Sequence, residues 1–345
     1  MSKTIAFFNL IRFKNLVIIA LTQFVIKYSL INYFVNDFVL SDFNFSLLVF
    51  ATVVITAAGY IINDIYDVDA DKINKNESVI IDKYISTKQA VWWYFAFNIV
   101  GLVIGVYLAF IVGSPILSII FIYSIYSLWT YSKKYKKSLL IGNIQVAFLT
   151  SLSILNLVLF DVEEFSTLLI NLGWMIYSYI GPDTWGYFIR EEYIEPISYP
   201  IILYIFIFYA GFSFLITFSR EIIKDIEDYT GDLAANAKTL VIAYGVRHAK
   251  QLAILLIVIV FILIAFIQFF QYSKISKFEN DIFYWGVNNI AIIYIICIQL
   301  LFVYLTLKIY NATHKKDFYF ISQLCKFIMI FGILSIPLFS YLHLN

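Results

Sequence analysis

Charged residues are scarce in this sequence. They make up 14% of its 345 residues, whereas 62% are hydrophobic and the mean hydropathy is +0.85. A water-soluble domain carries about a quarter charged residues and about half apolar ones. The composition therefore excludes an ordinary soluble domain and indicates an integral membrane protein.

Cysteine, histidine and net charge are also low, and each absence removes a class of protein. Two cysteines, Cys297 and Cys325, are too few for a disulfide scaffold or a zinc site built on paired cysteines. The three histidines, His248, His314 and His343, lie far apart on different segments, which argues against a histidine metal site. A net charge of +1 gives no sign of a nucleic-acid partner, so membrane lipids are the expected surroundings.

Nine mostly apolar stretches are long enough to cross a bilayer, which takes about 20 residues. They cover residues 15–35, 44–64, 90–112, 115–131, 140–160, 200–220, 249–271, 283–307 and 319–341. We therefore predict an all-α polytopic membrane protein, a single integral-membrane domain over residues 1–345 with about nine transmembrane helices in one bundle. The first stretch lacks a clean small-residue cleavage site, so we expect it to stay as an anchor.

The basic residues predict an orientation. If the N-terminus is cytoplasmic, most of the 24 lysines and arginines fall on the cytoplasmic side, as the positive-inside rule requires. Residues 161–199, which contain the acidic DVEE and REEYIE, then form an extracytoplasmic loop insertion. Within it, the aromatic stretch 166–188 is expected at the membrane interface. We predict a multi-pass protein of the cell inner membrane whose N-terminus and site loops are cytoplasmic.

Four aspartates follow the second apolar stretch, in the segment NDIYDVDADKINK. At about 100° per residue, Asp64, Asp67 and Asp71 fall on one face of a helix. Asn63 lies on the same face, whereas Asp69 points the other way. The pattern predicts an oxygen-rich helix face at the membrane end of the second span.

A matching segment, REIIKDIEDYTGD, follows the sixth apolar stretch. Asp225, Asp228 and Asp232 repeat the i, i+3, i+7 spacing of the first segment. Glu221 falls on the same face, and Gly231 is a candidate helix end before Asp232. Four predicted spans separate the two segments, so both lie on the same side of the membrane.

Carboxylates on two facing helices repel each other strongly unless a cation lies between them. Oxygen ligands select a hard ion, and Mg²⁺ characteristically joins a few carboxylates to substrate phosphates. We therefore predict that the two faces bind Mg²⁺ around a diphosphate. The predicted metal-binding and catalytic residues are Asp64, Asp67, Asp71, Asp225, Asp228 and Asp232.

These segments resemble the two aspartate-rich motifs of the UbiA family of intramembrane prenyltransferases. The first motif continues as K-x-N, here Lys72 and Asn74, and the second is followed by K-T-L from Lys238. Residues 131–151, with Asn143, resemble the family's basic loop and following Gly-Asn. The second motif is most similar to the branch that includes digeranylgeranylglyceryl phosphate synthases.

The resemblance implies transfer of an isoprenyl group from an isoprenyl diphosphate to a lipophilic acceptor, in an intramembrane cavity open to the cytoplasmic side. The acceptor would be a glycerophosphate ether lipid or, alternatively, an aromatic quinone precursor. The implied substrate-binding residues are Asn63, Lys72, Lys133, Lys137, Asn143, Arg220, Lys224 and Lys238. A phosphorylated acceptor would also need basic partners, for which the candidates are Lys133, Lys134, Lys136, Lys137, Arg220 and Lys224.

One departure from the family pattern leaves other functions open. Many members continue the first motif as N-K-P-x-R, but here Asn76 replaces the proline and Ser78 the arginine. Either Lys75, Lys83 or a lysine of 133–137 contacts the diphosphate instead, or the chain is a catalytically silent lipid-binding relative. A cation transporter is a third alternative, which predicts carboxylates near the middle of spans rather than at their ends.

Membrane topology can be tested by labelling. In a background without native cysteines, single cysteines near residues 76, 135 and 235 are expected to react with an impermeant maleimide only from the cytoplasmic side. A cysteine near residue 192 is expected to react only from outside, because an odd number of spans separates it from residue 76. Reaction of residues 76 and 192 from the same side would contradict the nine-span arrangement.

Overall fold

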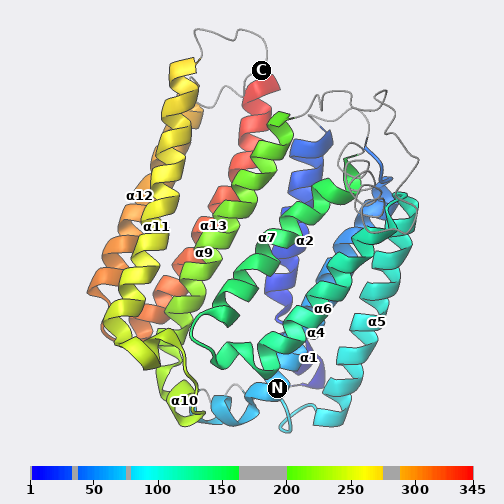
Figure 1. The fold of residues 1–345 in the computed structure, drawn as a ribbon, viewed down its shortest axis with the longest axis vertical. Coiled ribbons are helices and arrows are strands. Elements are labelled where there is room, and N and C mark those ends of the chain that lie inside the picture. The colour runs from blue at the N-terminus through cyan, green and yellow to red at the C-terminus, as the bar shows by residue number, and fades with distance from the viewer. Residues whose placement is uncertain (1, 33–37, 75–78, 163–199, 275–287, 345) are drawn as a thin grey trace, which may run out of the picture.

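A computed structural model of the chain describes residues 2–32, 38–74, 79–162, 200–274 and 288–344. These residues form helices joined by short connections, with two isolated β-bridges. Figure 1 shows an elongated bundle with α1, α10 and the N-terminus at one end and the C-terminus at the other. The elements are α1 (Lys3–Leu10), α2 (Phe13–Ile26), the π-helix η1 (Lys27–Ile31), α4 (Asp42–Asn74), α5 (Thr87–Ile111), η3 (Pro115–Leu117), α6 (Ser118–Lys133), η4 (Tyr135–Lys137), α7 (Ile141–Asp161), α9 (Pro200–Glu227), α10 (Tyr229–Ala234), α11 (Leu240–Lys274), α12 (Asn289–Asn311) and α13 (Lys315–Leu344).

The predicted spans are confirmed. Within the described part of the chain, nine helical segments are long and apolar enough to cross a membrane. Their ends differ from the hydropathy estimate by up to nine residues, at the seventh span, which begins at Leu240 rather than at residue 249. The reason is that caps rather than hydropathy set the termini. Helix α5, for example, begins after Ser86, whose side chain accepts a hydrogen bond from the Gln89 N–H in a capping box. The predicted loop 161–199 lies outside the described residues beyond Val162 and stays a prediction, as does the interfacial position of 166–188.

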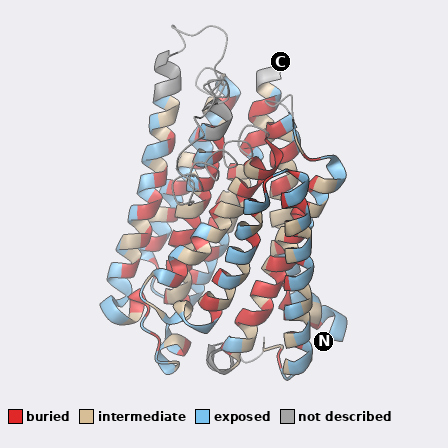
Figure 2. Cartoon of the chain, turned by 45° about the vertical axis from the view of Figure 1, so that its right-hand side comes forward, coloured by how far each residue is buried: buried red, intermediate tan, exposed pale blue. Residues whose placement is uncertain are grey.

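Exposed apolar side chains cover the outside of the bundle. Trp92 on α5 and Phe266 on α11 are both more than half exposed. Figure 2 shows buried residues on the inward faces of the helices and exposed residues on the outward faces. Such a surface is stable in contact with lipid tails and would be an aggregation liability in water. The fold is therefore that of an integral membrane protein.

Helix α5 packs closely against α4, which carries the first aspartate motif. Gly101 and Gly105 lie one turn apart on α5. A Cβ at Gly101 would lie 2.5 Å from Ile55 Cγ1 on α4, and one at Gly105 would lie 2.4 Å from the Phe121 ring on α6. Small residues at this spacing allow membrane helices to approach closely. The two glycines thus fix α5 against α4 and α6.

A buried ion pair holds the end of the bundle remote from α10. Lys27 Nζ in η1 lies 2.5 Å from Asp161 Oδ2 at the end of α7, and neither side chain is exposed. Asp161 Oδ1 accepts a hydrogen bond of 3.0 Å from the Leu40 N–H, just before α4. The Phe38 ring lies 4.2 Å from Lys27 Nζ. The pair therefore joins α2, α7 and the start of α4.

Loss of one partner of this pair is expected to destabilise the bundle. Lys27→Met leaves Asp161 buried without a counter-charge, which costs about 3–5 kcal/mol for pairs of this kind. The double variant Lys27→Met, Asp161→Asn removes both charges and keeps an acceptor for Leu40, so it is expected to recover most of the loss. Thermal unfolding in detergent measures the stability of the single and the double variant. Lys308→Met, at an exposed position on α12, is the control. Equal losses in the single and double variants would contradict this account.

Candidate functional site

A cavity of about 860 Å³ runs between α2, α4, α6, α7, α9 and α13. One end is charged and includes Asp64, Asp67 and Lys136. The other end is apolar and includes Phe121 and Ile336. The cavity therefore suits a molecule with an anionic or polar head and a long hydrocarbon tail.

The first aspartate motif lies on the last turns of α4, which continues to Asn74, so the predicted helical conformation of the motif is present. Asn63, Asp64 and Asp67 all line the cavity. Asn63 Nδ2 donates a hydrogen bond of 2.7 Å to Asp67 Oδ2, while Asn63 Oδ1 is buried without a hydrogen-bond partner. Three further side chains of the motif lie outside the described residues: Asp69, Asp71 and Lys72.

Two cations contact the α4 carboxylates. Arg12 Nη2 lies 3.1 Å from Asp64 Oδ1, and its guanidinium lies 4.7 Å from the centre of the Tyr60 ring. Burial lowers the pKa of Arg12, but Asp64, together with Tyr60 and Tyr131, outweighs burial and raises that pKa above its ordinary value. Lys136, from η4, forms an ion pair with Asp67. Positive charge from two loops is thus concentrated on one helix end.

The second motif crosses a helix break. Helix α9 ends at Glu227, and Asp228 is the N-cap of α10 with φ −94° and ψ 9°. The predicted continuous helix face therefore stops before Asp228, and Gly231, the predicted helix end, lies inside α10. The Asp228 N–H still donates to the Lys224 carbonyl at 2.8 Å, which keeps the turn close to helical.

The carboxylates of the second motif approach those of the first. Asp228 lines the cavity, and α10 packs against α4. Burial raises the pKa of Asp232 to about 6; Lys136 opposes that rise, while the charges of Asp228 and Asp67 add to it. Asp67 and Asp232 therefore lie within electrostatic range of each other. Within the described part of the chain, no three acidic, cysteine or histidine side chains converge as a metal site.

Asn143 joins the basic loop to the second motif. Its Nδ2 donates a hydrogen bond of 2.8 Å to Asp225 Oδ2. The preceding residue has to be glycine, because a Cβ at Gly142 would lie 2.5 Å from the Tyr135 carbonyl oxygen. The Lys238 N–H donates to the Lys137 carbonyl at 2.8 Å. These contacts hold the loop that carries Lys136 beside the start of α11.

The predicted basic residues divide into two groups. Arg220 and Lys224 line the cavity. Lys133, Lys137 and Lys238 have exposed side chains that do not contribute to the described cavity wall. The ammonium of Lys133 instead lies 4.6 Å from the centre of the Trp129 ring.

Sequence reasoning did not place Arg12, Asn15 or Lys326 in the site, yet all three line the cavity. Lys326 Nζ donates a hydrogen bond of 3.2 Å to Asn15 Oδ1. A lone lysine within an apolar span was a usable signal, because such residues mark functional sites in membrane proteins. Arg12 precedes the first span and carries no comparable signal.

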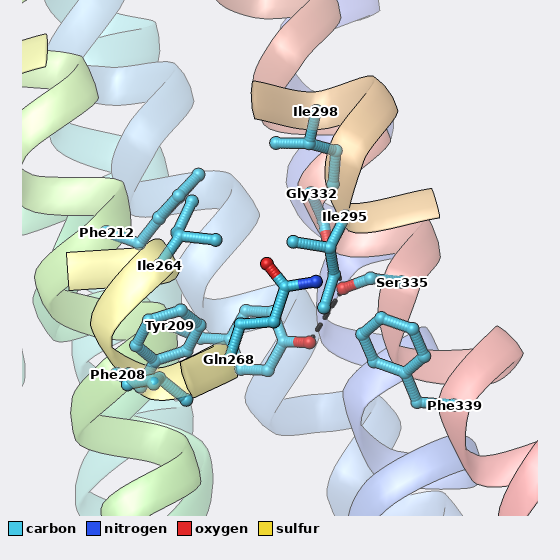
Figure 3. A pocket seen from close by; sticks show the side chains of 11 residues that line it. Phe208, Tyr209, Phe212, Ile264, Gln268, Ile295, Ile298, Gly332, Ser335 and Phe339 are labelled. Carbon is cyan, nitrogen blue, oxygen red and sulfur yellow. Dashed lines mark hydrogen bonds between the residues drawn. The ribbon is translucent and has the colours of Figure 1, made fainter. Parts of the chain in front are cut away.

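The apolar end of the cavity adjoins a small pocket between α9, α11, α12 and α13. Tyr209, Phe212 and Gly332 line both spaces. Figure 3 shows the side chains of Gln268 and Ser335 beside the Tyr209 hydroxyl, which lies 2.7 Å from Ser335 Oγ. Tyr209, Phe212 and Gly332 therefore form the wall between the cavity and the pocket.

Curated proteins from several archaea are similar to this chain in sequence. A digeranylgeranylglyceryl phosphate synthase of Methanosphaera stadtmanae is 28% identical over 298 residues, which cover 84% of each chain. Those of Methanobrevibacter smithii and Saccharolobus solfataricus are 32% and 31% identical over 201 and 203 residues. These two matches span 58% and 57% of the relatives' lengths, which is less than two thirds.

Two solved structures share the fold. One is described by the words "Structural and mechanistic insights into the biosynthesis of Digeranylgeranylglyceryl phosphate synthase in membranes". It has a TM-score of 0.59 and 23% identity, and the alignment covers 99% of both chains. The other is the apo structure of a UbiA homolog from Aeropyrum pernix K1, with a TM-score of 0.57, 12% identity and coverage of 98% of this chain and 99% of that one.

The sequence profile described as the UbiA prenyltransferase family matches residues 28–324. That range is most of the chain and contains both aspartate motifs, the basic loop and the Gly-Asn pair. The chain therefore belongs to the UbiA prenyltransferase family.

Proposed function

We propose that the protein transfers an isoprenyl group from an isoprenyl diphosphate to a glycerophosphate ether lipid, with Mg²⁺ as its cofactor. One observation carries the proposal: a single cavity joins carboxylates of both motifs to a long apolar space. An isoprenyl diphosphate has the same division into an anionic head and a hydrocarbon tail. The digeranylgeranylglyceryl phosphate synthases among the relatives support the choice of acceptor.

The charged end of the cavity fits Mg²⁺ in its chemistry. The proposed ligands are Asp64, Asp67, Asp71, Asp225, Asp228 and Asp232. The buried Asn63 Oδ1, which has no hydrogen-bond partner, adds a neutral oxygen donor beside them. All of these donors are hard oxygens of the kind that Mg²⁺ prefers. When bound, the ion neutralises charge on the diphosphate and so favours its departure.

Arg12 and Lys136 are placed to stabilise the leaving diphosphate. Arg12 forms an ion pair with Asp64 of α4, and Lys136 forms one with Asp67. Negative charge grows on the diphosphate as its bond to C1 of the isoprenyl group breaks, and fixed cations at that position lower the barrier. Lys136 is our candidate for the base that takes over from the motif arginine replaced by Ser78.

The apolar part of the cavity binds the donor tail and shields the reacting carbon from water. Its walls, which include Ile26, Phe121 and Ile336, surround the donor tail and keep water from the allylic cation. A hydroxyl of the acceptor then attacks C1 to form the ether, and a carboxylate of the site takes its proton. Water exclusion makes ether formation faster than hydrolysis of the donor.

We place the active site on the cytoplasmic side of the cell inner membrane. The N-terminus, α1 and α10 lie at one end of the bundle (Figure 1). That end also carries the basic loop with Lys133, Lys134, Lys136 and Lys137. The positive-inside rule supports a cytoplasmic position for it.

The metal proposal predicts different effects for the proposed metal ligands and for Asp69. Asp64→Asn and Asp225→Asn are each expected to lower kcat on the order of 10²–10³-fold, because each removes a proposed ligand of the ion that neutralises the leaving diphosphate. Asp69→Asn is expected to change kcat by less than about threefold, because helical periodicity points residue 69 away from the others. Excess EDTA is expected to abolish activity, and Mg²⁺ to restore it.

The assay follows diphosphate release and identifies products by mass. Purified protein receives geranylgeranyl diphosphate with geranylgeranylglyceryl phosphate, a hydroxybenzoate or a naphthoate. Full activity in EDTA, or an equal loss at Asp69, would contradict the metal site. Prenylation of an aromatic ring alone would contradict the ether-lipid acceptor, and no product with any acceptor would indicate a silent lipid-binding relative.

Tail binding in the apolar end predicts a change in donor preference. A Cβ at Gly332 would lie 3.3 Å from Phe212 Cε1, so Gly332→Leu narrows the cavity there. We expect kcat/KM for a C20 donor relative to a C10 donor to fall roughly tenfold, the effect of about two buried methylenes. Gly211→Leu on α9 is the control, because a Cβ there meets no atom within 4 Å. If the ratio of kcat/KM for the C20 and C10 donors is unchanged in Gly332→Leu, the donor tail does not bind in this part of the cavity.

A further inference from the structure

Two cations on α9 pair with one carboxylate of the cavity wall, and a third cation, on α13, lies within electrostatic range of it. Arg220 Nη1 lies 2.7 Å from Glu221 Oε1, and Lys224 Nζ lies 3.1 Å from Glu221 Oε2. The charges of Arg220, Lys224 and Glu221 also act on Lys326. All four residues line the cavity. The three-cation cluster of Arg220, Lys224 and Lys326 therefore has a formal excess of two positive charges over Glu221.

Lys326 has an unusual position for a lysine. It lies eleven residues after Lys315, the first residue of α13, which is roughly 16 Å along a helix. In the described part of the chain its ammonium donates to a neutral acceptor, Asn15 Oδ1, and to no carboxylate. A charged group at this depth costs free energy and marks a functional site by default.

Arg220 also has an N–H group that is not used in a hydrogen bond. Its side chain is 18% exposed and donates to Glu221 through Nη1. Its Nε is buried and has no hydrogen-bond partner among the described residues. A guanidinium with an unused donor in a cavity is suited to bind a second anion.

The cluster adjoins the ion pairs at the metal end, because the charge of Arg12 acts on both Lys326 and Glu221. Arg12 and Lys136 are already matched with Asp64 and Asp67. Asn15, which accepts from Lys326, lies about one helical turn further into the membrane than Arg12. The cavity therefore offers a second anion position, one level deeper than the carboxylates.

We infer that the three-cation cluster binds the phosphate of the acceptor, a phosphomonoester on a glycerol ether lipid. The inference rests on the proposed prenyl transfer. A phosphomonoester carries about −1.5 to −2 charges near neutral pH, which matches the excess of two positive charges. An acceptor without phosphate would leave Lys326 without a counter-charge. Phosphate bound here holds the glycerol hydroxyl inside the cavity, beside the end where C1 of the donor lies.

Lipid binding without Mg²⁺ or donor tests the cluster independently of catalysis. Geranylgeranylglyceryl phosphate and its dephosphorylated alcohol are titrated into the full-length protein in detergent. Wild type is expected to bind the phosphate form about 100-fold more tightly than the alcohol. Lys326→Met is expected to lose about 10- to 100-fold in affinity for the phosphate form and none for the alcohol. Lys326→Arg is expected to keep most of the affinity.

Two controls separate charge from folding. Lys308→Met removes an exposed lysine of α12 and is expected to leave both affinities unchanged. Alcohol binding reports whether Lys326→Met still folds. If wild type binds the two lipids equally, or if Lys326→Met weakens both alike, the inference is wrong.

Turnover separates failure of this inference from failure of the proposed function. With Mg²⁺ and saturating donor, Lys326→Met is expected to raise the acceptor KM at least about tenfold and to change the donor KM less than about threefold. A raised donor KM instead would assign the cluster to the donor and overturn the inference. Selective phosphate binding without any product would support the cluster and contradict the proposed transfer.

Discussion

The arrangement of the site depends on pairing the α4 carboxylates with cations from distant parts of the chain. Arg12 reaches Asp64 across 52 residues, and Lys136 reaches Asp67 across 69 residues. Carboxylates at a membrane boundary are costly without counter-charges, because the surroundings solvate them poorly. The N-terminal segment and the basic loop are therefore held against α4. The cavity wall between them is a consequence of this charge pairing.

The two ends of the bundle use buried charge differently. At the remote end, Lys27 and Asp161 neutralise each other and are fully enclosed. At the motif end, carboxylates and cations line an open space of about 860 Å³. A closed end supports packing of α2, α4 and α7, whereas an open end can exchange its internal pairs for contacts with an anionic ligand and its metal ions.

Local sequence rules predicted the parts of the fold that depend on local properties. Hydropathy is enough to predict the spans. Helical periodicity is enough to predict the face of α4 that carries Asp64 and Asp67. The break after Glu227 was missed because no glycine or proline marks it. The contacts of Arg12 and Lys326 were missed because they are tertiary: Lys326 meets Asn15 across 311 residues. Periodicity carries no information on such distances.

The central claim is that both aspartate motifs act together on one diphosphate through divalent ions. The most direct measurement is a structure of the full chain with a non-reactive isoprenyl thiodiphosphate and Mn²⁺, whose anomalous signal locates the metal. The account predicts Mn²⁺ between carboxylates of α4 and of the Asp225–Asp232 segment, with the isoprenyl tail in the apolar end of the cavity. Mn²⁺ bound to one motif alone, or a tail outside the cavity, would contradict it.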